Sequence, residues 1–119
     1  MSYSEKIREV IDGPDVALFM KGTPAFVMCG NSDRALQALR RAGAPVTAVD
    51  ILPDPAIRQE LTSISGWPTI PQVFVKGELV GGADIVEELE QSGELELALR
   101  EKLGDDYAAA RDETTVALT

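Results

Sequence analysis

The sequence predicts a single α/β domain with a four-stranded mixed sheet flanked by helices. Two observations support this prediction. The apolar segments 16–20 and 46–51 enclose a helical segment, and a strand–helix–strand unit with short connections places its two strands parallel. Lys76-Gly77 then joins two short strand-like segments, as in an antiparallel hairpin. At 119 residues the chain has room for one core and not for two.

The elements are expected in the order helix, strand, helix, strand, helix, strand, strand, helix, helix. The first seven are predicted over 4–11, 16–20, 30–42, 46–51, 55–63, 72–75 and 78–81. Ser4 is expected to cap the first helix, and the unbroken apolar run at 16–20 is typical of a strand buried on both faces. Asp54 and Pro55 are a typical helix start, Asp84 is expected to cap the eighth element, and the last helix follows Gly93.

The negative charge is concentrated in the second half of the chain. Residues 1–45 carry six basic and five acidic side chains, whereas residues 46–119 carry five basic and fifteen acidic ones. Such a surface repels phosphate backbones, so nucleic-acid binding is not expected. The simplest role of this charge is solubility. The domain is expected to span 4–103, followed by an acidic, flexible tail over 104–119.

No apolar run approaches the roughly 18 residues that a membrane span needs, and the first residues do not resemble a secretory signal. We therefore expect a cytoplasmic protein that does not bind membranes. The chain has no histidine and one cysteine, which excludes an internal disulfide, histidine-ligated metal sites and Ser-His-Asp triads.

Cys29 lies where an irregular segment meets the start of a predicted helix. Unpaired N–H groups and the positive end of the helix dipole both stabilise a thiolate there. Lys21, at the end of the first strand, can add a full positive charge, so the thiol pKa should fall below about 8.5. The alternative is that Cys29 is a small buried apolar residue, as free cysteines often are.

Three further features can form a groove with this thiol. A cis peptide before Pro71 would leave the backbone of Ile70 free to pair with an extended ligand; the alternative is a trans proline at an edge strand. The segment 82–84 opens a helix whose N-terminus binds anions, with Asp84 able to take an ammonium group or to act as an ordinary cap. Arg58 is either a second cation or a solvated surface residue. Together these groups suit a small peptide with carboxylates at both ends and one amine.

Several blocks of the sequence resemble monothiol glutaredoxins of the CGFS type. The resemblance covers about residues 4–103 and rests on the segments 21–24 (KGTP), 29–32 (CGNS), 67–72 (WPTIPQ), 75–82 (VKGELVGG) and 84–86 (DIV). It implies a thioredoxin fold with Pro71 cis, an active thiol at Cys29 and a site for glutathione. Position by position, Lys21 and Arg58 would meet the glycine carboxylate of glutathione, Ile70 would pair with its cysteinyl part, and Ala83 and Asp84 would hold its γ-glutamyl end.

The resemblance also implies a metal cargo and partners. In this family two subunits and two glutathiones typically hold one [2Fe–2S] cluster, with Cys29 as the ligand from each chain, and pass it to apo-proteins. The four sulfur ligands match what such a cluster takes. The protein would then be a monomer without the cluster and a homodimer with it. The chain differs from the family pattern at Asn31, where the family has Phe, at Val27, where it usually has proline, and at Ala83, where some members have a second cysteine.

Three functions follow as hypotheses. The first is an iron–sulfur carrier that supplies apo iron–sulfur clients. The second is a glutathione-dependent thiol–disulfide oxidoreductase, in which Cys29 attacks a glutathione mixed disulfide and a second glutathione resolves the intermediate. The third is a binding module whose acidic half docks a BolA-like protein or a basic client.

Overall fold

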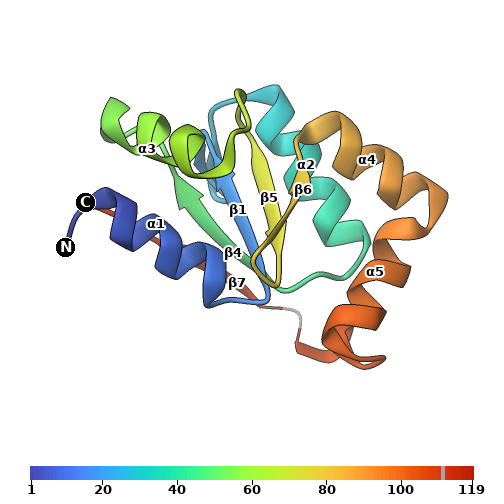
Figure 1. Cartoon of the computed structure of the whole chain (residues 1–119). Helices are drawn as coiled ribbons and strands as arrows, with labels where there is room; N and C mark the ends of the chain where they lie inside the picture. Colours follow the sequence, from blue (N-terminus) through green and yellow to red (C-terminus); the bar gives the residue numbers. More distant parts are fainter. Residues whose placement is uncertain (111) are drawn as a thin grey trace.

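The computed structural model describes residues 1–110 and 112–119 and contains a five-stranded sheet in the order β6-β5-β1-β4-β7 (Figure 1). These strands are β1 (Val16–Met20), β4 (Val46–Asp50), β5 (Gln72–Val75), β6 (Glu78–Gly81) and β7 (Glu113–Val116). The central strand β1 pairs in parallel with β4 and antiparallel with β5, and β5 and β6 form the expected hairpin. The predicted mixed sheet is therefore confirmed, with one strand more than expected.

Helices cover both faces of the sheet (Figure 1). They are α1 (Tyr3–Asp12), α2 (Gly30–Arg41), α3 (Pro55–Ser65), α4 (Ala83–Ser92) and α5 (Glu94–Leu103). Side chains alternate along β1, so Leu18 and Met20 pack with α2, α4 and α5, whereas Phe19 packs with α1 and α3. All five residues of β1 are buried, as the apolar run predicted. None of the helices among the described residues is long and apolar enough to cross a membrane.

Two predicted helix caps are wrong by two residues. The N-cap of α1 is Ser2 rather than Ser4, because Ser2 and Glu5 form a reciprocal capping box with each other's backbone N–H groups. The N-cap of α4 is Gly82, which places Asp84 in the first turn of the helix rather than before it. The start of α3 is as predicted, with Asp54 as the cap and Pro55 as the first helical residue.

The C-terminal segment does not form the expected flexible tail. After the short 3₁₀ helix η1 (Tyr107–Ala110), β7 pairs in parallel with β4, and Leu118 is buried in the same cluster as α1 and α3. Arg40 on α2 forms an ion pair with Glu113. Without β7, the N–H and C=O groups along one edge of β4 would be unpaired, so the tail completes the sheet. Residue 111 of this segment lies outside the described residues.

The stretch between β1 and Cys29 is a small hairpin made of β2 (Gly22–Thr23) and β3 (Phe26–Val27), where the sequence predicted an irregular segment. Gly22 has φ +92°, and a Cβ atom there would lie 2.2 Å from the carbonyl oxygen of Phe26. Only glycine fits this position without strain. The hairpin therefore fixes the chain directly before the cysteine.

Candidate functional site

Cys29 occupies the N-cap position of α2 and is partly exposed. Its backbone is extended, with φ −152° and ψ 131°, and the helix begins at the next residue. The backbone N–H groups of the first helical turn therefore lie close to the sulfur and have no partner within the helix. The prediction that this thiol sits at the start of a helix is confirmed, and the alternative of a fully buried cysteine is wrong.

Hydrogen bonding holds the pKa of the Cys29 thiol below its ordinary value. Bonding of the sulfur with the backbone amide of Ser32 is the largest cause, the backbone amide of Asn31 and the hydroxyl of Ser32 add to it, and the charge of Lys21 contributes least. Partial burial acts in the opposite direction and is outweighed. The sequence predicted a lowered pKa from the helix N-terminus together with Lys21, and both contribute, the amides of the first helical turn more than the lysine.

Ser32 connects the first strand to this thiol. Its side chain is completely buried, and its Oγ accepts a hydrogen bond of 3.0 Å from the backbone N–H of Lys21. The same hydroxyl interacts with the sulfur of Cys29. Because Lys21 directly follows β1, this bond ties the start of α2 to the end of the central strand.

Two apolar side chains flank the cysteine on the preceding segment. Phe26 is 78% exposed and Met28 is 66% exposed, which is unusual for side chains of this size. Their exposure leaves the sulfur beside an apolar surface that another molecule can cover.

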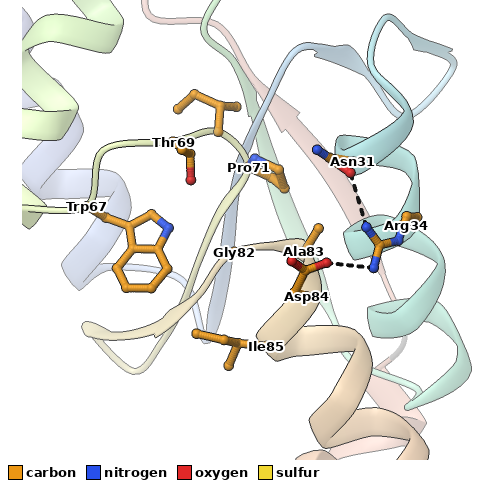
Figure 2. A pocket seen from close by; sticks show the side chains of 10 residues that line it. Asn31, Arg34, Trp67, Thr69, Pro71, Gly82, Ala83, Asp84 and Ile85 are labelled. Atoms are coloured by element: carbon orange, nitrogen blue, oxygen red, sulfur yellow. Dashed lines mark hydrogen bonds and ion pairs between the residues drawn. The ribbon is translucent and has the colours of Figure 1, made fainter.

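A pocket of about 400 Å³ lies between α2, the segment before β5 and the start of α4 (Figure 2). Its lining residues are Asn31, Arg34, Trp67, Thr69, Ile70, Pro71, Gly82, Ala83, Asp84 and Ile85. The peptide bond between Ile70 and Pro71 is cis, as predicted. Three of the predicted site residues, Ile70, Ala83 and Asp84, therefore lie together in this pocket.

The other two predicted ligand-binding residues line a separate pocket of about 370 Å³. Lys21 and Arg58 lie there with Ile51, Leu52, Pro55 and Gln59. Cys29 lines neither pocket, but it is coupled to both: Lys21 acts on the charge of its sulfur, and Asn31 belongs to the first turn of α2 and to the first pocket. The predicted ligand-binding residues thus form two separate subsites rather than one continuous pocket. Lys21 and Arg58 belong to one of them, and Asp84 belongs to the other.

The sequence did not point to Trp67 or Arg34 as residues of the first pocket. Trp67 presents a buried indole Nε1 that has no hydrogen-bond partner among the described residues, and a Cβ on Gly82 would lie 3.3 Å from it. Arg34 on α2 reaches across to α4, where it bonds with Asp84 (Figure 2) and with Glu87. The three-residue spacings from Asn31 to Arg34 and from Asp84 to Glu87 each place two polar groups on one helix face, which was the available sequence signal.

The described part of the chain contains no group of three or more Cys, Asp or Glu side chains that could hold a metal ion. An iron–sulfur cluster takes four sulfur ligands, and this chain has one cysteine. Any cluster at Cys29 would therefore need three thiolates from other molecules.

Comparisons with known proteins agree with this geometry. The family model named Glutaredoxin matches residues 16–80. A protein of Legionella pneumophila named probable monothiol glutaredoxin GrlA is 54% identical over 84 residues, which are 71% of this chain and 94% of that protein. Monothiol glutaredoxin-S11 of Oryza sativa is 48% identical over 100 residues, 84% of this chain, but this chain spans only 20% of its length.

Solved structures show the same fold. A monomeric truncated mutant of 1-C-Grx1 from Trypanosoma brucei has a TM-score of 0.77 and 40% identity, over 86% of this chain and 93% of that one. A buckwheat glutaredoxin–glutathione complex has a TM-score of 0.72 and 25% identity, over 83% of this chain and 88% of that one. The predicted thioredoxin-type α/β fold is thus confirmed, and the chain belongs to the glutaredoxin family, with close relatives among the monothiol glutaredoxins.

Proposed function

We propose that this protein binds glutathione beside Cys29. The cysteinyl part would lie along the backbone of Ile70, which lines the first pocket, and the γ-glutamyl end would meet Ala83 and Asp84 in the same pocket. The glycine carboxylate would be attracted by Lys21 and Arg58, which line the neighbouring pocket. The glutathione complex of the buckwheat relative supports this choice of ligand.

We further propose that the protein carries a [2Fe–2S] cluster as cargo and transfers it to apo-proteins. The observation that supports this most directly is a single thiol of lowered pKa, partly exposed at the start of α2. One chain and one glutathione supply two thiolates, so two of each complete the four ligands of such a cluster. The exposed side chains of Phe26 and Met28 offer an apolar surface beside the sulfur that a second subunit would cover on loading.

Anaerobic reconstitution with iron, sulfide and glutathione tests this function. The expected product is a dimer that absorbs visible light, formed from a monomeric apo-protein. Cys29→Ser should lose the absorption because serine does not supply a thiolate, and omission of glutathione should lose it too. A chromophore that persists in Cys29→Ser would refute the ligand assignment.

A thiol–disulfide oxidoreductase is the second candidate, and the lowered pKa of Cys29 favours it as well. The Cys29 thiolate would attack the glutathione sulfur of a protein–glutathione disulfide, forming a Cys29–glutathione disulfide and releasing the protein thiolate. A second glutathione thiolate would attack the glutathione sulfur of that intermediate, which yields oxidised glutathione and restores the Cys29 thiolate. Rapid turnover of a glutathionylated substrate, with no cluster formed on reconstitution, would favour this function over the carrier.

A further inference from the structure

Arg34 bonds with three polar side chains at the rim of the first pocket, and Figure 2 shows two of them, Asn31 and Asp84. Its Nη2 donates to Asp84 Oδ1 at 2.9 Å and to Glu87 Oε1 at 2.8 Å, and its Nε donates to Glu87 Oε2 at 3.2 Å. Its Nη1 donates to Asn31 Oδ1 at 3.1 Å. Asn31 is the position at which this chain differs from the CGFS pattern, so this arrangement uses a residue particular to this sequence.

At this rim, one N–H group of Arg34 and one carboxylate oxygen of Asp84 are available to a ligand. A guanidinium has five N–H donors, and four of those of Arg34 are used by the bonds above. No residue that the structure describes accepts the fifth, which is on Nη1. Asp84 uses only Oδ1, and its other oxygen has no partner within the described ranges. The side chains of Arg34 and Asp84 are 40% and 90% exposed, so both free groups are open to a ligand.

Arg34 also offsets the acidity of this part of the pocket. Asp84 and Glu87 lie one helical turn apart on α4, and together they would repel a carboxylate. The guanidinium neutralises one of these two charges. Bonding with Arg34 is the largest cause that holds the pKa of Glu87 below its ordinary value, so Glu87 remains ionised and keeps the arginine in place.

We propose that Arg34 is a specificity-determining residue: beside Asp84, it makes the pocket select ligands whose end carries both an α-carboxylate and an α-ammonium group. Asp84 would accept from the ammonium and Arg34 would donate to the carboxylate. This inference rests on the proposed binding of glutathione, whose γ-glutamyl end has this chemistry, and it adds a residue from α2 to a site assigned to α4.

Isothermal titration with three thioethers tests this proposal without redox chemistry. The ligands are S-methylglutathione, its glutaryl analogue, which lacks the ammonium group, and its 4-aminobutanoyl analogue, which lacks the α-carboxylate. The proteins are the wild type, Arg34→Gln and Arg41→Gln. Arg41 is the matched control because it also pairs α2 with α4, through Glu90, and does not line the pocket.

Arg34→Gln should weaken the binding of S-methylglutathione and of the glutaryl analogue, the two ligands that keep the α-carboxylate, about threefold, a size typical of partly exposed charged pairs. It should leave the 4-aminobutanoyl analogue unchanged or bound more tightly, because Asp84 then loses a competing cation. Arg41→Gln should change none of the three affinities.

Two results would overturn the inference while leaving glutathione binding intact: equal weakening of all three ligands by Arg34→Gln, or no change in any of them. If the wild type itself does not bind S-methylglutathione, the proposed function fails, and the inference fails with it. Cooperative thermal unfolding of both variants, with midpoints close to that of the wild type, would show that neither has lost its fold.

Discussion

Replacing Ser32 with alanine should reduce both the stability of the protein and the acidity of Cys29. The hydroxyl of Ser32 accepts the backbone N–H of Lys21 at 3.0 Å inside the protein, and its side chain is completely buried. Its loss leaves that N–H without an acceptor, which costs about 1–3 kcal/mol. Taking about 2 kcal/mol, and about 4 °C per kcal/mol for a chain of this size, the unfolding midpoint should fall by about 8 °C.

The same substitution removes a hydroxyl that stabilises the Cys29 thiolate, so the pKa of the thiol should rise. The rate of alkylation by iodoacetamide, measured against pH by mass spectrometry, reports the thiolate fraction. Its midpoint should move to higher pH in Ser32→Ala, whereas the exposed control Ser63→Ala should change neither the midpoint nor the stability. An unshifted alkylation profile in a destabilised Ser32→Ala would refute the role of this hydroxyl in activating the thiol.

Three further predictions concern the backbone, the thiol and the tail. Gly22→Ala should destabilise the protein by at least about 2 kcal/mol in urea unfolding, because the added Cβ meets the carbonyl oxygen of Phe26; a change below 0.5 kcal/mol, a threshold near the usual surface effect, would contradict this. Folding lowers the pKa of Cys29, so the free energy of unfolding of the wild type, relative to that of Cys29→Ser, should rise with pH between the native pKa and about 8.5. Below the native pKa this difference should not depend on pH. A difference that stays constant across pH 6–9 would be inconsistent with a stabilised thiolate. Leu118→Ala should cost about 2 kcal/mol if the tail is docked, against almost nothing for the exposed Leu97→Ala, and equal effects in thermal unfolding would indicate an undocked tail.

The central elements of the fold were predictable because their signals are local. The apolar run of β1, the cap and first proline of α3 and the Lys76-Gly77 turn each depend on neighbouring residues, and all three are confirmed. The docking of β7 is different, since its strand is largely exposed and alternates too weakly to be recognised. It forms because β4, far away in sequence, offers an unpaired edge.

In the candidate site, too, some features follow from local sequence and others depend on tertiary packing. The position of Cys29 before a helix follows from local sequence. The position of Pro71 at a strand entry left the cis and trans peptides open, and the resemblance to monothiol glutaredoxins implied the cis form that is present. The role of Arg34 depends on how α2 packs on α4, which spacing within one helix does not reveal. Lys21 and Arg58 line a different pocket from Asp84, and this separation is likewise a result of tertiary packing.

Amide chemical-shift mapping during titration with reduced glutathione tests the central proposal most directly. We expect saturable shifts at the amides of Ile70, Ala83 and Asp84, together with those of the first turn of α2 after Cys29. Such a pattern would place the tripeptide along the pocket and beside the thiolate. The proposal would be contradicted by a spectrum that does not change, or by shifts confined to the surface formed by the two chain ends around Lys6.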